Sequence, residues 1–262
     1  QLRDKPRPGH SDYGASVKFA NHNDISGGGH FSARLTAPLC IAGGICKQLL
    51  EQQGVEIAAH LQQVYDVTDV PFNTMAIQEN EKNLCDKEFP TISDEAGTKM
   101  KALIAEVKSG GDSVGGIVEC RAVGMPVGIG THMFDGVENR LSTAIFGIPA
   151  VKGIEFGNGF DSIRLKGSAN NDGFRMEQGK VVTESNRHGG ILGGMTSGMP
   201  LIFRIVVKPT PSIFKPQHTV SLSQKGNAEL CITGRHDPCV ALRAVPVVEA
   251  VTAIVLYDLL QD

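Results

Sequence analysis

Two short segments of the sequence place side chains that can bind anions or move protons beside a tight turn. In RPGH, a Pro-Gly turn brings Arg7 close to His10. An arginine can hold a carboxylate or a phosphate through two parallel hydrogen bonds, and a histidine can transfer a proton near pH 7. In GRHDP, one cation, Arg235, stands beside two proton-transfer groups, His236 and Asp237. Each segment, taken alone, also fits an ordinary surface turn.

Three further segments combine glycine or proline with groups that suit an anion or a flat ligand. GGGHFSAR, residues 27–34, leads into an expected helix, whose first backbone amides favour an anion. The glycines of SNRHGGILGGMTSG, residues 185–198, suit a loop pressed against the flat face of a ligand. KPTPSI offers an amine on Lys208 and hydroxyls on Thr210 and Ser212, all suited to phosphate. A linker, a disordered glycine loop and a plain strand exit stay open as alternatives.

The composition argues against several classes of binding partner. With 41% hydrophobic and 20% charged residues among 262, the chain has the balance of a soluble globular protein of one or two domains. The net charge of −3 gives no general attraction to nucleic acid or to an anionic membrane, and no apolar run reaches the ~18 residues of a spanning helix. The six cysteines form no CxxC pair, which favours reduced thiols in the cytoplasm and no metal site.

Hydrophobic periodicity predicts the elements that position these segments. Apolar residues at helical spacing, with Thr36 as a cap and Pro38 in the first turn, predict a helix over 35–52. Inside it, Gly43 and Gly44 predict close packing against a neighbour. We also expect helices over 93–108, 135–146 and 244–260, strands over 55–70, 115–123, 151–156, 201–207 and 230–233, and loops over 1–33. Because the elements show no βαβ rhythm, we expect a mixed α+β layered domain.

The motifs, taken together and in order, resemble those of one family. RPGHSDY, GGGHFSAR, FDGVENRLSTAIFGIPAVKGIEFGNGF, NNDGF, SNRHGGILGGMTSG, KPTPSI and GRHDPCVALRAVPVVEA follow one another as they do in chorismate synthases. The resemblance runs from Arg7 to Leu260. It implies an α+β fold, a β-α-β sandwich with helices packed between antiparallel sheets. It also implies that residues 1–262 form a single domain of this kind, which works in the cytoplasm as a homotetramer.

The resemblance implies a carbon–oxygen lyase of the shikimate pathway, which leads to the aromatic amino acids. The expected reaction is the 1,4-anti elimination of phosphate from 5-enolpyruvylshikimate 3-phosphate, which gives chorismate. Members of the family need reduced FMN although the reaction has no net redox change, and some reduce their own flavin with NADPH. We therefore expect FMN as the cofactor and this phosphate ester as the small-molecule partner.

The resemblance also implies site residues. His10 would keep the reduced flavin neutral by protonation, and Asp237 would help to take the flavin N5 proton; these two are the expected catalytic residues. The expected substrate-binding residues are Arg7, His10, Arg34 and Arg235. The expected FMN-binding residues are His30, Phe31, Ser32, Pro149, Ala150, Gly193, Lys208, Pro209, Thr210, Pro211, Ser212 and Arg235.

Two departures from the family pattern matter. His30 and Phe31 stand where the family often has Arg-Ser, which puts a side-chain contact to FMN there in doubt. The family's leading GESHG segment, with a second catalytic histidine, and its RRRPG stretch do not occur in the sequence. We expect that this segment is either lost or truly absent. In the second case the chain would be a truncated, catalytically weak module that binds FMN or phosphate. A structural protein on an old enzyme scaffold is a third reading.

Overall fold

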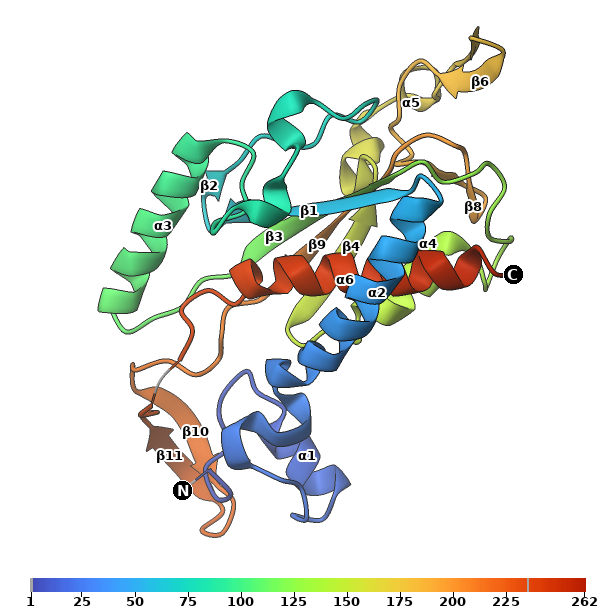
Figure 1. The fold of residues 1–262 in the computed structure, drawn as a ribbon. Helices are drawn as coiled ribbons and strands as arrows, with labels where there is room; N and C mark the ends of the chain where they lie inside the picture. Colours follow the sequence, from blue (N-terminus) through green and yellow to red (C-terminus); the bar gives the residue numbers. More distant parts are fainter. Residues whose placement is uncertain (1, 235) are drawn as a thin grey trace.

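Five strands form one antiparallel sheet through the middle of the molecule (Figure 1). The structure is a computed structural model and describes residues 2–234 and 236–262. From edge to edge the sheet holds β2 (Val67–Thr68), β1 (Glu56–Val64), β3 (Gly116–Val123), β9 (Leu201–Val207) and β4 (Val151–Phe156). Cys120 of β3 pairs with Ala59 on one side and with Phe203 on the other. β3 and β9 are mostly buried along their length, which explains their long apolar runs.

A layer of three helices lies against this sheet: α2 (Ala37–Gln52), α4 (Val137–Ile145) and α6 (Ala241–Leu259). α6 packs against β1 and β3, and most of its residues are buried, as its strongly apolar sequence predicts. α2 and α6 cross at close range. A side chain on Gly43 would overlap the backbone of Ala250, so only glycine fits at this crossing. The expected close packing is therefore confirmed at Gly43. It is wrong at Gly44, where a side chain would meet open space.

The side of α2 that faces away from the sheet is also apolar. Leu35, just before the helix, and Leu39, Ile41 and Ile45 within it are exposed, and Ile41 is 71% exposed. α2 thus has apolar side chains both on the side that packs against α6 and on the side exposed to solvent. Helices, antiparallel sheets and this layered arrangement confirm the expected α+β class. Among the described residues, no helix is long and apolar enough to span a membrane.

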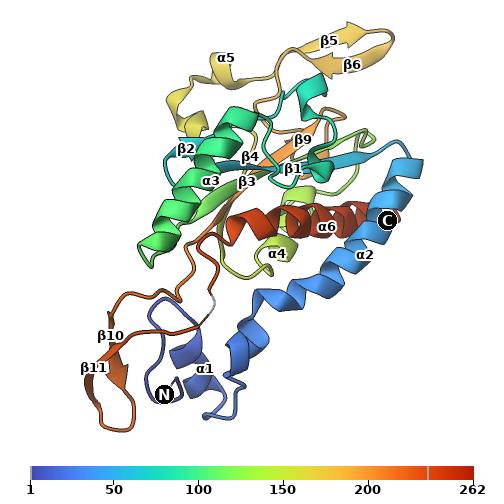
Figure 2. The ribbon, with the colours of Figure 1, turned by 60° about the vertical axis from the view of Figure 1, so that its left-hand side comes forward.

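The expected helix over 93–108 is α3 (Asp94–Ser109), which lies beside β2 at the sheet edge (Figure 2). The Ser93 side chain accepts a hydrogen bond from the backbone of Ala96, and Gly110 ends the helix. The expected strand over 55–70 is divided, because Tyr65 takes a left-handed conformation with φ of 52° between β1 and β2. The helices expected at 135 and 244 begin instead at Val137 and Ala241.

Three hairpins lie outside the main sheet. They are β5 (Phe174–Glu177) with β6 (Lys180–Thr183), β7 (Ile191–Leu192) with β8 (Met195–Thr196), and β10 (Gln217–Ser221) with β11 (Gly226–Leu230). The first and the last project from opposite ends of the molecule (Figure 2). The expected strand over 230–233 is wrong, since β11 ends at Leu230. The glycine-rich segment expected as an open loop contains the β7–β8 hairpin.

Short helices complete the chain. They are α1 (Asp12–Lys18), η1 (Ser26–Phe31), η2 (Ala33–Thr36), η3 (Glu79–Glu81), η4 (Leu84–Asp86), η5 (Gly159–Arg164) and α5 (Gly167–Asn170). The prediction that residues 1–33 are loops is therefore wrong at α1 and η1. The many polar and glycine residues of these two helices give no helical periodicity. Tertiary contacts, rather than intrinsic helix propensity, stabilise such short helices.

Candidate active site

The segment after β9 meets the N-terminal turn below the sheet. The Nζ of Lys208 donates a hydrogen bond to the carbonyl of Gly9, and the Lys208 backbone donates to the carbonyl of Ala150 at 3.0 Å. A side chain on Gly9 would contact Cβ of Pro211 at 3.4 Å. The RPGH turn, the Pro149-Ala150 turn and the KPTPS segment are thus brought together. In Figure 1 they lie where the N-terminal segment runs beside the β10–β11 hairpin.

A buried carboxylate organises the RPGH turn. Asp12, at the start of α1, is only 8% exposed. Its Oδ1 lies 2.6 Å from Nδ1 of His10 and 2.8 Å from Nη2 of Arg7, and its Oδ2 lies 2.6 Å from Nε of Arg7. Burial raises the pKa of Asp12, but the hydrogen bonds from Arg7 and His10 outweigh burial and hold this pKa well below its usual range. Asp12 is therefore ionised at neutral pH.

His10 has one ring nitrogen engaged and one open. Among the residues that the structure describes, all of its hydrogen-bond and ion-pair contacts are made by Nδ1. Nε2 points toward the glycine-rich segment, where a side chain on Gly28 would lie 4.0 Å away. Because Gly28 has φ of 96°, a conformation that side chains disfavour, glycine keeps this space clear.

The rest of the glycine-rich segment forms a compact turn before α2. His30 lies between the rings of Phe19 and Phe31, with centroids 6.3 and 6.4 Å away. The Ser32 side chain accepts a hydrogen bond from the backbone of Arg34 at 3.3 Å. Arg34 itself is exposed at the surface. The aromatic contacts give His30 a packing role, whether or not a ligand also binds it.

The GRHDP segment adds a second histidine beside the N-terminal turn. Burial and, to a smaller extent, the charge of Arg7 lower the pKa of His236, so this imidazole is neutral near pH 7. Asp237 accepts hydrogen bonds from Nε of Arg243 and from the backbone of Cys239. These two donors fix the carboxylate that the sequence identifies as catalytic. Arg235, expected to bind both substrate and cofactor, lies outside the described residues.

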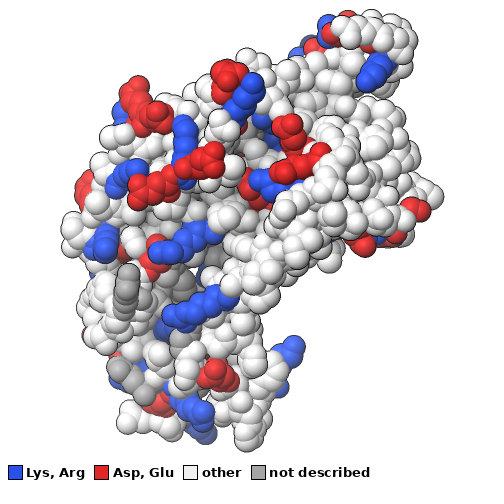
Figure 3. Space-filling view, viewed as in Figure 1, with Lys and Arg blue, Asp and Glu red and all other residues white. Residues whose placement is uncertain are grey.

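The site is cationic and has unused hydrogen-bonding capacity. Partial burial and then the charge of Lys152 lower the pKa of Lys208, which shows that two amines share this region. Figure 3 shows basic side chains over the lower part of this face and most acidic ones over its upper part. Four buried side-chain polar atoms in the described part of the chain have no hydrogen-bond partner. Two of them, Oγ1 of Thr210 and Nδ1 of His236, belong to this site.

The structure does not bring Gly193 to this group within one chain. Gly193 is in the turn of the β7–β8 hairpin, which packs beside Gly130 and Gly136. This hairpin lies where β9 begins, whereas Lys208 follows the end of β9. A strand of seven residues spans about 20 Å, so the two ends of β9 are remote from each other. Gly193 and Lys208, both expected to bind FMN, therefore do not meet inside a single chain.

Sequence reasoning gave no site role to Asp12 or Arg243, and it noted His236 only as a proton-transfer group in GRHDP. Asp12 stands two residues after His10 in the same motif, and an acidic residue near an arginine and a histidine is a signal that could have been used. Arg243 gives no such signal, because the turn before α6 brings it to Asp237.

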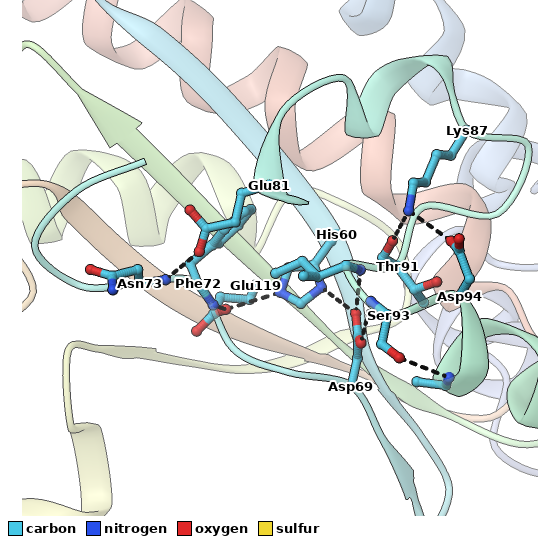
Figure 4. Close-up of polar contacts among 12 residues, drawn as sticks. His60, Asp69, Phe72, Asn73, Glu81, Lys87, Thr91, Ser93, Asp94 and Glu119 are labelled. Atoms are coloured by element: carbon cyan, nitrogen blue, oxygen red, sulfur yellow. Dashed lines mark hydrogen bonds and ion pairs between the residues drawn. The ribbon is translucent and has the colours of Figure 1, made fainter. Parts of the chain in front are cut away.

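A second histidine cluster lies inside the protein, away from this site (Figure 4). His60 of β1 is 0% exposed, with Nδ1 at 3.1 Å from Asp69 and Nε2 at 3.0 Å from Glu119. Burial lowers the pKa of His60, but its hydrogen bonds to the two carboxylates outweigh burial and raise this pKa overall. Asp69 also accepts from the backbone of Ile92 and Ser93, so the cluster fastens the segment between β2 and α3 to the sheet.

Comparisons with known proteins identify the family of the chain. The sequence model of the chorismate synthase family matches residues 1–261. A chorismate synthase of Lancefieldella parvula is 46% identical over 97% of this chain and 70% of the relative's length. One from Pyrococcus abyssi is 46% identical over 98% of this chain and 70% of its own length. A solved crystal structure of a chorismate synthase superposes with a TM-score of 0.79 at 28% identity, over 95% of this chain and 70% of that one. The chain therefore belongs to the chorismate synthase family of carbon–oxygen lyases.

Proposed function

We propose that this chain catalyses the 1,4-anti elimination of phosphate from 5-enolpyruvylshikimate 3-phosphate to give chorismate, with reduced FMN as its cofactor. One observation carries the proposal beyond family membership. Lys208, which contacts Gly9, and the unpartnered hydroxyl of Thr210 belong to a segment that packs against the turn of His10, whose Nδ1 is held by a buried carboxylate. A cationic site of this kind suits a substrate with two carboxylates and a phosphate.

The residues around Lys208 fit the polar tail of FMN. Lys208 supplies a point charge, Thr210 has a buried oxygen with no partner in the described chain, and Ser212 supplies a buried hydroxyl. When bound, reduced FMN would lend an electron as the bond to phosphate breaks and recover it as hydrogen leaves the substrate. Pro149, Ala150, Pro209 and Pro211 shape the walls of this region in the proposal, and Ser32 closes it from the glycine-rich segment.

His10 and Asp237 carry the proton steps in the proposal. His10 presents Nε2 toward the glycine-rich segment, where it would donate a proton to a bound ligand. Asp237, held by Arg243 and the Cys239 backbone, would accept a proton as the substrate loses hydrogen. Arg34 and Arg235 would hold the substrate's acidic groups. Arg7 would contribute chiefly its charge, because two of its three guanidinium nitrogens already contact Asp12.

The decisive experiment measures phosphate release from the substrate with chemically or photochemically reduced FMN under anaerobic conditions, beside an FMN titration followed by absorbance. We expect turnover in the wild type, and a sharp loss in Asp237→Asn with FMN affinity preserved. Asp161→Asn, an exposed carboxylate paired with Arg164, is the matched control and should behave as the wild type. Equal turnover in Asp237→Asn and the wild type would contradict the role of Asp237.

The second candidate function is a catalytically weak module that binds FMN or phosphate. It is favoured by the exposed apolar side of α2. FMN binding without phosphate release would support the module. Absence of binding to both FMN and inorganic phosphate would contradict both functions.

The proposal extends to assembly, location and reductant. We propose a homotetramer that works in the cytoplasm and contacts neither membrane nor nucleic acid. The six cysteines, all within the described residues, are free thiols, which suits a reducing compartment. Adding NADPH in place of chemically reduced flavin tests whether the chain reduces FMN itself, and light scattering gives the assembly state.

A further inference from the structure

We infer that Asp12 is a positioning residue for His10. Its carboxylate decides which ring nitrogen of His10 carries a proton and turns the other nitrogen toward the glycine-rich segment. The inference deepens the proposed function and rests on it only for the part that His10 plays in the reaction. The placement of the proton is a property of the chain itself.

The first argument is the contact between Asp12 and His10. Oδ1 of Asp12 lies 2.6 Å from Nδ1 of His10, with the two side chains 8% and 14% exposed. An ionised carboxylate only accepts hydrogen bonds, so the nitrogen facing it must donate. The lowered pKa of Asp12 shows that the carboxylate is ionised. Nδ1 of His10 therefore carries a proton, and Nε2 is the nitrogen that is free to gain or lose one.

The second argument excludes the opposite arrangement. Nη2 of Arg7 lies 3.2 Å from Nδ1 of His10, and an unprotonated Nδ1 could in principle accept from it. That arrangement would leave two lone pairs, one on Nδ1 and one on the carboxylate, facing each other at 2.6 Å. Since Arg7 already donates to Oδ1 of Asp12 at 2.8 Å, it has a better acceptor beside it.

The third argument is that Asp12 cannot turn away from His10. Arg7 holds both oxygens: its Nε and backbone N lie 2.6 and 3.1 Å from Oδ2, and its Nη2 lies 2.8 Å from Oδ1. Asp12 is also the first residue of α1, where the helix favours a negative charge. Arg7 therefore fixes Asp12, and Asp12 fixes the imidazole, in the way that an orienting carboxylate acts on a catalytic histidine.

The test is NMR of the full chain with ¹⁵N-labelled histidine, assigned with His10→Gln, together with kcat, KM and FMN affinity. We expect His10 of the wild type to show a strongly downfield Nδ1 proton. In Asp12→Asn this signal is lost and kcat falls roughly 10- to 100-fold, the range for removing an orienting partner. FMN affinity should change by no more than about twofold, because Asp12 contacts His10 and Arg7, whereas the proposed FMN contacts are made by Lys208 and Thr210.

Two matched variants serve as controls. Asp4→Asn changes a carboxylate of the same N-terminal segment that binds Ser221 and Ser223, so the His10 signal and kcat should persist. Asp172→Asn removes the partner of His188, whose Nδ1 lies 2.7 Å from Asp172, so it should change only the His188 signal.

The inference is overturned if His10 of the wild type carries its neutral-state proton on Nε2, a measurement that needs no variant. It is also overturned if Asp12→Asn keeps both the His10 signal and kcat. Should the wild type bind FMN but release no phosphate, the proposed function fails alone. The spectra of wild type and Asp12→Asn would then still decide whether Asp12 positions His10.

Discussion

His10 and His60 are both held by carboxylates, yet the chain uses them in opposite ways. Asp69 and Glu119 take both ring nitrogens of His60, and the ring is wholly buried. Asp12 takes only Nδ1 of His10, which leaves Nε2 without a partner among residues 2–234 and 236–262. An imidazole with both nitrogens engaged can only hold structure together, whereas one with a single engaged nitrogen is oriented and can still exchange a proton.

The surroundings of the two rings agree with this division. Glu119 also accepts from the backbone of Phe72 at 2.7 Å, and the Phe72 ring lies 4.6 Å from the ring of His60 and 4.3 Å from the guanidinium of Arg121. Around His60, every strong donor and acceptor is satisfied inside the protein. Around His10, by contrast, two polar atoms on Thr210 and His236 are buried and unsatisfied. A cluster whose hydrogen-bond donors and acceptors are all satisfied within the protein is structural, whereas buried polar atoms without a partner indicate a place where a ligand binds.

The largest expected effect is on stability at His60. We expect His60→Leu to lower the free energy of unfolding by about 3–5 kcal/mol, because it leaves two buried carboxylates without their cation. Urea denaturation followed by circular dichroism measures this change. His218→Leu, an exposed histidine on β10, is the control and should stay close to the wild type. A loss in His60→Leu as small as that of the control would refute the structural role of His60.

The next effect separates activity from stability at His10. We expect His10→Gln to reduce turnover about 100-fold, the lower range for a lost proton-transfer group, while the free energy of unfolding changes by less than about 1 kcal/mol. Steady-state kinetics and urea denaturation give the two numbers. His22→Gln, which changes an exposed histidine of the same N-terminal segment, provides the comparison. If His10→Gln lost stability and kept turnover, the contrast with His60 would be reversed.

A third effect is the pH dependence of stability. Burial opposes protonation of His60, but its carboxylate partners prevail and raise its pKa, so the folded chain binds this proton more tightly than the unfolded chain. The resulting stabilisation is complete below the pKa of histidine in the unfolded chain, about 6.5, and is lost as the pH rises through the pKa in the folded chain. Its size is about 1.4 kcal/mol for each unit by which the two pKa values differ. Urea midpoints measured across the alkaline range should fall in the wild type. The fall should be weaker in His60→Leu, and an equal fall in both would assign it to other groups.

The smallest effect is expected at His188, which stands between the two cases. Its Nδ1 contacts Asp172, but its side chain is 29% exposed, and Asp172 is also bound by Ser185 and by backbone amides. We therefore expect His188→Gln to cost less than about 1 kcal/mol, since Asp172 keeps its other donors. Thermal denaturation is sensitive enough for this comparison. A loss as large as that of His60→Leu would show that burial is not what separates the clusters.

The sequence predicts best where one local signal decides the structure. The strands over 151–156 and 201–207 have the predicted bounds, and the second is a short, mostly apolar run that begins directly after Pro200. The α3 helix follows from its serine cap and terminal glycine. The β5–β6 hairpin escapes such reasoning, because its residues are mostly exposed and have no buried face to set a period of two.

The parts of the candidate site also differ in how far the sequence predicts them. The RPGH and KPTPS segments lie side by side, whereas composition alone left each of them open as an ordinary turn or strand exit and only the family resemblance placed both in one site. The separation of Gly193 from Lys208 could not be predicted, because it depends on which end of β9 each turn adjoins. The His60 cluster was also missed. Its carboxylates come from sequence positions 69 and 119, and only strand pairing brings Glu119 opposite His60.

The close contact of Gly43 with Ala250 fixes the point at which α2 and α6 cross. α2 begins three residues after Arg34, and α6 begins four residues after Asp237. At 1.5 Å per residue, the crossing lies about 9 Å from the start of α2 and about 14 Å from the start of α6. A methyl group added at Gly43 would push the two helices apart where they cross, and would thereby change the spacing between Arg34, nine residues before Gly43, and Asp237, thirteen residues before Ala250.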